Sequence, residues 1–136
     1  MEQKAIDLKA ADNVRLLAAA MVEKAKSGHP GGAMGGADFV HVLFSEFLKF
    51  DPNDPEWDNR DRFFLDPGHM APMLYSQLAL IGKYTLEDLK NLRQWGSVTP
   101  GLASALSVNR RTSGWPMVLS SLLDAGMVCE GIAGGG

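Results

Sequence analysis

The stretch Ser27-Gly28-His29-Pro30-Gly31-Gly32-Ala33-Met34-Gly35-Gly36-Ala37-Asp38 decides the fold, because it separates two segments whose apolar residues recur at helical spacing. Glycine and proline disfavour helix interiors, so their density here predicts a loop that a ligand or another backbone can approach closely. Where such a loop opens into a helix, backbone N–H groups lie beside the imidazole of His29. Two interpretations remain open: a site for an anionic cofactor or polar substrate, and a tight inter-helix turn with His29 in solvent.

Composition bounds the class of protein. The 136 residues correspond to one domain or to a piece of a larger one, and 46% hydrophobic residues can form a packed core. A net charge of −3 gives no basic surface for nucleic acid, and no apolar run is long enough for a membrane span. Cys129 is the single cysteine, which excludes an internal disulfide and favours a reducing, cytoplasmic location.

Helical spacing is clear on both sides of the glycine-rich stretch. Apolar residues at three- and four-residue steps predict a first helix over about 3–26, which Gly28 and Pro30 end. A second helix is expected over about 34–49, with a broad apolar stripe made of Phe39, Val40, Leu43, Phe44, Phe47 and Leu48. His41 interrupts this stripe, and we expect it at a surface or an interface rather than as a ligand.

A short apolar run predicts a strand. Residues 62–65 lack alternation, which is typical of a strand buried on both faces of a parallel sheet. Asp66-Pro67-Gly68-His69 ends the run, and a helix is expected over about 72–82. Ligands of open α/β sheets bind beyond the carboxyl ends of strands, so His69 is a candidate site residue. The alternative is a solvated position in the first turn of that helix.

The remaining segments are read from their local chemistry. Thr85-Leu86-Glu87-Asp88 resembles a capping box and predicts a helix to about residue 93, followed by a polar loop over 95–101. Arg110-Arg111 is expected in a solvated turn, and a short helix is expected over 116–125.

Several short motifs, taken in order, resemble the N-terminal, thiamin diphosphate-binding part of transketolases. Residues 1–101 carry the resemblance, whereas residues 102–136 depart from the family pattern. The departure favours a fragment, or a frame-shifted or chimeric tail. The motifs are Lys26-Ser27-Gly28-His29-Pro30-Gly31, Met34-Gly35, Ala37-Asp38, Arg60-Asp61-Arg62-Phe63, Gly68-His69 and Ser97-Val98-Thr99-Pro100-Gly101.

The resemblance implies an α/β fold, here a truncated piece that is mostly helical with one or two short parallel strands. It implies ketol transfer between sugar phosphates, with thiamin diphosphate and Mg²⁺ as cofactors. His29 and His69 correspond to catalytic histidines, and His69, Gly68 and Gly114 to cofactor-binding positions. The family's metal-binding motif is absent from this sequence, so no metal ligand is assigned.

Three functions remain open. The first is an N-terminal transketolase fragment, inactive as a lone chain, that works as a homodimer or with the remaining transketolase domains. The second is a binding subunit of a split transketolase, and the third is a non-enzymatic helical interaction module that uses the phenylalanine stripe. In the first two, His29 and His69 are expected to converge at the carboxyl end of the buried strand.

Overall fold

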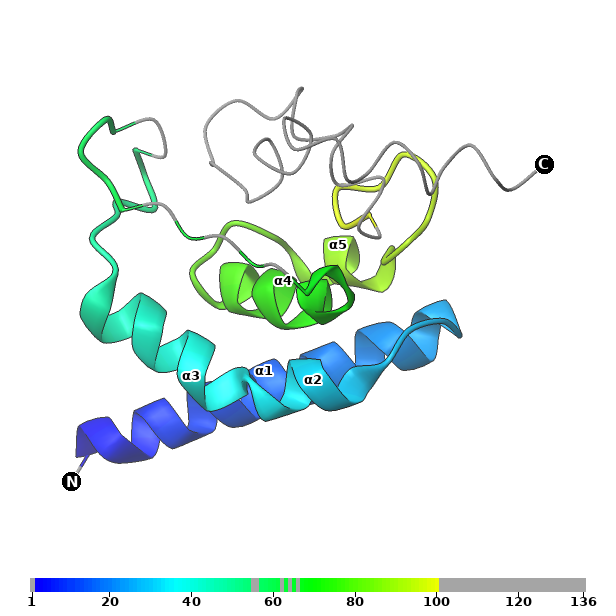
Figure 1. The fold of residues 1–136 in the computed structure, drawn as a ribbon, viewed down its shortest axis with the longest axis horizontal. Coiled ribbons are helices and arrows are strands. Elements are labelled where there is room, and N and C mark those ends of the chain that lie inside the picture. Colours follow the sequence, from blue (N-terminus) through cyan, green and yellow to red (C-terminus); the bar gives the residue numbers. More distant parts are fainter. Residues whose placement is uncertain (1, 55–56, 62, 64, 66, 101–136) are drawn as a thin grey trace.

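Helices make up the regular structure of the described part of the chain. The computed structural model describes residues 2–54, 57–61, 63, 65 and 67–100 (Figure 1). The elements in chain order are α1 (Glu2–Ala25), α2 (Pro30–Gly35), α3 (Ala37–Val42), the π-helical turn η1 (Leu43–Phe47), the 3₁₀ turn η2 (Gly68–Met70), α4 (Ala71–Leu80) and α5 (Leu86–Lys90).

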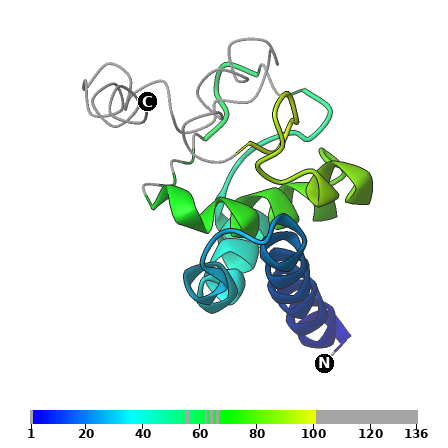
Figure 2. The same cartoon turned by 90° about the vertical axis from the view of Figure 1, so that its right-hand side faces the viewer.

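The helices pack in two layers. Helix α1 lies beside the α2–α3 segment, and α4 lies across both (Figure 2). One apolar cluster fills the space between these helices, and a second joins α1 and α4 to α5. The first contains Val14, Ala18, Ala33, Ala37, Val40, Phe44, Leu65, Met73, Leu74 and Leu78, and the second contains Met21, Val22, Tyr75, Leu89 and Leu92. Within the described ranges, no helix is long and apolar enough to cross a membrane.

The glycine-rich stretch is helical over most of its length, which corrects the expectation of a loop. Helix α2 begins at Pro30, whose fixed φ and missing N–H suit the first turn. Backbone bonds from Gly36 N to the Gly32 carbonyl (3.0 Å) and from Val40 N to the Gly36 carbonyl (2.9 Å) carry the helix into α3. The glycines therefore let the α2–α3 segment approach its neighbours closely, and the true loop is confined to residues 26–29.

The predicted strand over 62–65 is not formed at its two described residues, Phe63 and Leu65. Leu65 is buried as predicted, but it packs into the helical core as part of an irregular connection. A strand requires a neighbouring strand for its backbone bonds. The described residues contain no sheet; an isolated antiparallel bridge joins Asp51 and Asp54.

The capping box predicted at Thr85 and Asp88 is confirmed. The Thr85 hydroxyl accepts from the Asp88 N–H (3.2 Å), and the Asp88 carboxylate accepts from the Thr85 N–H (2.8 Å). These reciprocal bonds start α5, as the spacing predicts. The expectations for the turn at Arg110-Arg111 and for the helix over 116–125 fall outside the described residues.

Candidate functional site

His29 and His69 lie together on the surface, although they come from segments far apart in the sequence. Their ring centroids are 6.5 Å apart, and the rings meet edge to face at 83°. His29 occupies the N-cap position of α2, and His69 lies in η2 immediately before α4. Both side chains are exposed. The predicted convergence is therefore observed, but the ends of two helical segments create it rather than the end of a strand.

Backbone conformation fixes the loop that carries His29. Helix α1 ends through Lys26 (φ 51°) and Gly28 (φ 122°), and the second value favours glycine. A side chain at Gly28 would also meet Val22, 3.5 Å away. The hydroxyl of Ser27 accepts a bond from the Arg93 guanidinium (Nη1 to Oγ, 2.6 Å), which ties the loop to the segment after α5.

The segment that ends at Pro100 is held from two sides. The Arg93 N–H donates to the carbonyl of Thr99 (3.0 Å), and the Thr99 hydroxyl donates to the carbonyl of Asp88 (2.7 Å). The hydroxyl of Tyr75, on α4, donates to the Pro100 carbonyl (2.9 Å). Burial raises the pKa of Tyr75 well above its usual range, so this hydroxyl keeps its proton and its role as a donor.

Close packing positions His69 against α2. A Cβ atom added at Gly32 would lie 3.1 Å from Met70 Cγ and 3.6 Å from His69 Nε2. Glycine at this position lets α2 reach η2, and that approach brings the two imidazoles together. A Cβ atom added at Gly31 would meet no other described atom within 4 Å, so the surface beside His29 is open.

The chemistry of this histidine pair suits an oxygen-rich ligand. An imidazole can donate a hydrogen bond to a phosphate oxygen or exchange a proton with a hydroxyl near neutral pH. Gly68 opens the turn that carries His69, whereas Gly114 lies outside the described residues. No cluster of three or more potential metal ligands exists in the part of the chain that the structure describes. The pair therefore offers hydrogen-bond donors suited to the oxygen atoms of a phosphate group.

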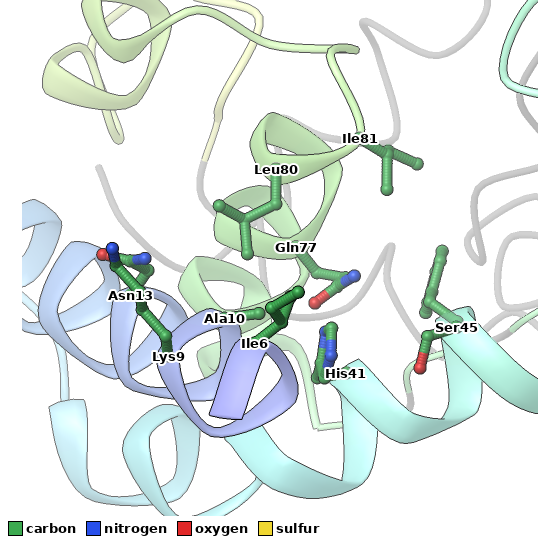
Figure 3. Close-up of a pocket in the computed structure, with 10 residues that line it drawn as sticks. Ile6, Lys9, Ala10, Asn13, His41, Ser45, Gln77, Leu80 and Ile81 are labelled. Atoms are coloured by element: carbon green, nitrogen blue, oxygen red, sulfur yellow. The ribbon is translucent and has the colours of Figure 1, made fainter. Parts of the chain in front are cut away.

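A separate pocket of about 330 Å³ lies between α1, α3–η1 and α4 (Figure 3). His41 lies in it with 12% of its side chain exposed, and its Nε2 is 3.3 Å from Asp7 Oδ1. Gln77, on α4, is 2% exposed. The Nδ1 atom of His41 and the Oε1 atom of Gln77 are buried without a hydrogen-bond partner among the described residues. His41 is thus largely enclosed between helices.

Arg93 is a site-supporting residue that the sequence analysis missed. Its bond to Ser27 and its backbone bond to Thr99 connect two of the motifs on which the resemblance rests. No local sequence pattern marks Arg93, because Ser27 is 66 residues away in the sequence and Thr99 lies beyond the turn that follows Arg93. Its positive φ of 63° is the one unusual local feature, and a conformation of this kind is visible only in the structure.

The comparisons with known proteins agree with these motifs. The family model described as "Transketolase, thiamine diphosphate binding domain" matches residues 6–114. Transketolase 10 of Craterostigma plantagineum is 55% identical over 95 residues, which cover 68% of this chain and 14% of that protein. A probable transketolase of Schizosaccharomyces pombe is 52% identical over 97 residues, which cover 71% of this chain and 14% of that protein.

Solved structures show the same similarity. Pichia stipitis transketolase in complex with sedoheptulose-7-phosphate superposes with a TM-score of 0.68 at 49% identity, over 71% of this chain and 14% of that one. Campylobacter jejuni transketolase gives a TM-score of 0.65 at 49% identity, over 71% and 15% of the two chains. The chain thus spans about one seventh of the length of these relatives. It belongs to the transketolase family, as a segment of the thiamine diphosphate-binding domain.

Proposed function

We propose that this chain supplies His29 and His69 to the cofactor and donor-sugar site of a transketolase. The observation that carries the proposal is the 6.5 Å separation of the two exposed rings. The reaction is transfer of a two-carbon ketol unit between sugar phosphates, and the Pichia stipitis relative has been solved with sedoheptulose-7-phosphate and with fructose-6-phosphate. Thiamin diphosphate, when bound, supplies the electron sink for this chemistry.

The two histidines have separable roles in this proposal. His69, whose ring lies beside Gly32 of α2, donates to the diphosphate end of the cofactor. His29, at the start of α2, exchanges protons with hydroxyl groups of the donor sugar. The cofactor's metal ion is Mg²⁺ in this proposal, and a complete ligand set requires further polypeptide, because the described residues hold no group of three or more potential ligands.

The lone chain is expected to have no turnover. It spans 14% of its relatives, and the described residues hold no group of three or more potential metal ligands. A coupled ketol-transfer assay with thiamin diphosphate and Mg²⁺ checks this expectation. Substantial turnover by the purified 136-residue chain would contradict it.

The role of His69 is tested in a complete enzyme. Residues 6–100 replace the matching segment of Pichia stipitis transketolase, and the spliced enzyme carries His69→Asn. Loss of a charge-assisted hydrogen bond weakens cofactor affinity by about 1.5–3 kcal/mol. The measurement is the dissociation constant for thiamin diphosphate, with His41→Asn as the control because His41 lies in the separate pocket. An unchanged constant for His69→Asn removes His69 from the site.

A further inference from the structure

The pocket between α1, α3–η1 and α4 brings two buried polar atoms to one cavity. Gln77 of α4 is 2% exposed, and the side chain of His41 of α3 is 12% exposed. The ends of these two side chains point toward one another inside the pocket, beside Ile6 and Ala10 of α1 (Figure 3). Neither Gln77 Oε1 nor His41 Nδ1 has a hydrogen-bond partner among the described residues.

The contact between His41 and Asp7 determines which ring nitrogen of His41 carries the hydrogen. Nε2 of His41 lies 3.3 Å from Asp7 Oδ1, which also accepts a bond from Gln3 Nε2 at 3.0 Å. Because a carboxylate only accepts, Nε2 donates to it, and Nδ1 of the neutral ring is left as an acceptor. Gln77 Oε1 is an acceptor as well. The pocket therefore presents two acceptors that lack a donor within the described part of the chain.

These two acceptors require an explanation, because nearly all buried polar atoms in proteins are paired. A water molecule has two hydrogens and can bridge two acceptors. The cavity, however, has a volume of about 330 Å³, which is roughly ten times the volume of one water molecule. That volume lies at the lower end of the range for small-molecule pockets. A bound molecule of that size accounts for both the cavity and the unpaired acceptors.

The walls of the pocket define the chemistry of this molecule. Lys9, which is exposed, is the one charged side chain among the described residues that line the cavity, and its positive charge disfavours a cation. A hydroxyl group offers one donor and an aliphatic amine is a cation at neutral pH, whereas a primary amide is neutral and offers two donors. The remaining wall is mostly apolar, and its apolar members are Ile6, Ala10, Phe44, Leu80 and Ile81.

We propose that this pocket binds a small neutral molecule that carries a primary amide on an apolar body. The two N–H groups of the amide donate to Gln77 Oε1 and His41 Nδ1, and the apolar body packs against the apolar wall. The residues that line the pocket do not include His29 or His69. The proposal is therefore independent of the proposed function, and its test needs no ketol transfer.

Benzamide is the probe, because it joins a primary amide to an apolar ring. It is titrated into the full 136-residue chain at pH 8, where an ordinary histidine is neutral, and binding is followed by NMR of the backbone amides. We expect saturable binding with a dissociation constant on the order of 1 mM, and shifts centred on the residues that line the pocket. Acetophenone, which has a methyl group in place of the amide nitrogen, is expected to bind at least about tenfold more weakly.

Variants at glutamine test the polar contact within the chain. Gln77→Met keeps the length of the side chain and removes one acceptor, so it is expected to weaken benzamide binding at least about fivefold and to leave acetophenone binding unchanged. Gln94→Met is the matched control, because Gln94 is exposed and does not line the pocket. Circular dichroism establishes that each variant is folded.

Four results would overturn the proposal. Equal binding of benzamide and acetophenone would show an apolar hollow without a polar site. Benzamide binding that Gln77→Met leaves unchanged would place the probe elsewhere on the chain. Tighter binding of the benzamidinium cation than of benzamide would assign the pocket to cations. Absence of saturable binding up to the solubility limit of benzamide would mean that water alone pairs the two acceptors.

Discussion

Gln77 is nearly completely buried, and within the described part of the chain its amide oxygen has no hydrogen-bond partner. Its side chain lies in α4 at the pocket between three helices, and its Oε1 atom is buried without a hydrogen bond in the described residues. An unpaired buried polar atom costs about 1–3 kcal/mol. We therefore expect Gln77→Met, which keeps the length and removes the polar group, to raise the free energy of unfolding by about 1 kcal/mol.

Urea unfolding followed by circular dichroism measures this change. Gln94→Met is the matched control, because Gln94 is exposed and its replacement is expected to alter the free energy by less than about 0.5 kcal/mol. A loss of more than about 1 kcal/mol in Gln77→Met would mean that the amide makes a stabilising bond in solution.

The sequence alone identifies some of the residues that matter for the site and for stability, and does not identify others. His29 and His69 stand out in the sequence because each lies beside glycine and proline at an element boundary, and their rings meet at 6.5 Å, as the expected convergence requires. Local sequence does not mark Gln77 or Arg93: Arg93 bonds to Ser27, which is far away in the sequence, and the Oε1 atom of Gln77 has no partner among the described residues. The roles of the two histidines in the reaction, like that of Gly114, stay predictions.

Gly36 sets the distance between the α2–α3 segment and α4. A Cβ atom at this position would lie 2.6 Å from Met73 Sδ and 3.1 Å from Met70 Cε, and Met73 is 1% exposed. Because Met73 is enclosed by the core, it cannot move away freely. Gly36→Ala is expected to lower the free energy of unfolding by about 1–3 kcal/mol, the range for overpacking a core.

Gly35 provides the neighbouring control for this element. A Cβ atom there meets nothing within 4 Å in the described structure, and the residue ends α2. Gly35→Ala is therefore expected to be neutral or to stabilise by up to about 1 kcal/mol through helix propensity. Thermal unfolding of the two variants compares them directly, and a Gly36→Ala chain as stable as Gly35→Ala would contradict the close contact.

The capping box makes α5 a second test at the scale of one element. Thr85→Ala removes the acceptor for the Asp88 N–H, and Thr85→Ser keeps it. We expect a loss of about 1 kcal/mol for alanine and a much smaller loss for serine. Guanidinium unfolding midpoints, at an unchanged slope, measure both. Equal losses would show that the methyl group of Thr85, rather than its hydroxyl, stabilises the helix start.

Elements with local signals were predicted well, and those that depend on context were not. The bounds of α1 and α4 and the start of α5 follow from apolar spacing and capping chemistry close in the sequence. Local sequence predicts a loop at α2, because the low helix propensity of its glycines outweighs the helical spacing of its apolar residues. In the folded chain, the glycines at 32 and 36 leave room for Met70 and Met73, and this packing favours a helix there. The packing joins segments distant in the sequence, so local propensity cannot reveal it.

At the scale of the whole molecule, the expected parallel strand is the main difference from prediction. A buried apolar run such as 62–65 indicates a strand only if neighbouring strands exist to pair with it, and apolar periodicity does not distinguish such a run from a buried connection. No described residue belongs to a strand that could pair with this run, so Leu65 is buried without a strand neighbour. The mostly helical part of the fold prediction holds for the described residues, and its parallel strands do not.

The buried hydroxyl of Tyr75 makes the stability of the fold depend on pH above about pH 10. It is 1% exposed, and burial raises its pKa above the ordinary value near 10, with Tyr84 adding to the rise. Below pH 10 the Tyr75 hydroxyl is protonated in both the folded and the unfolded chain, so it makes the free energy of unfolding neither rise nor fall with pH. Above pH 10 the unfolded chain releases it while the folded chain keeps it, and stability falls by up to about 1.4 kcal/mol per pH unit.

Tyr75→Phe separates this titration from the rest of the molecule. Losing the bond to the Pro100 carbonyl is expected to cost about 1 kcal/mol at pH 8. Between roughly pH 10.5 and 12 the variant is expected to lose stability less steeply than the unaltered chain, because Tyr84, whose pKa is also raised by burial, still titrates. Urea unfolding at half-unit pH steps measures both slopes, with return to pH 8 to establish reversibility. Parallel slopes would mean that the Tyr75 hydroxyl reaches solvent before the chain unfolds, since only a hydroxyl that stays buried in the native state opposes its own ionisation.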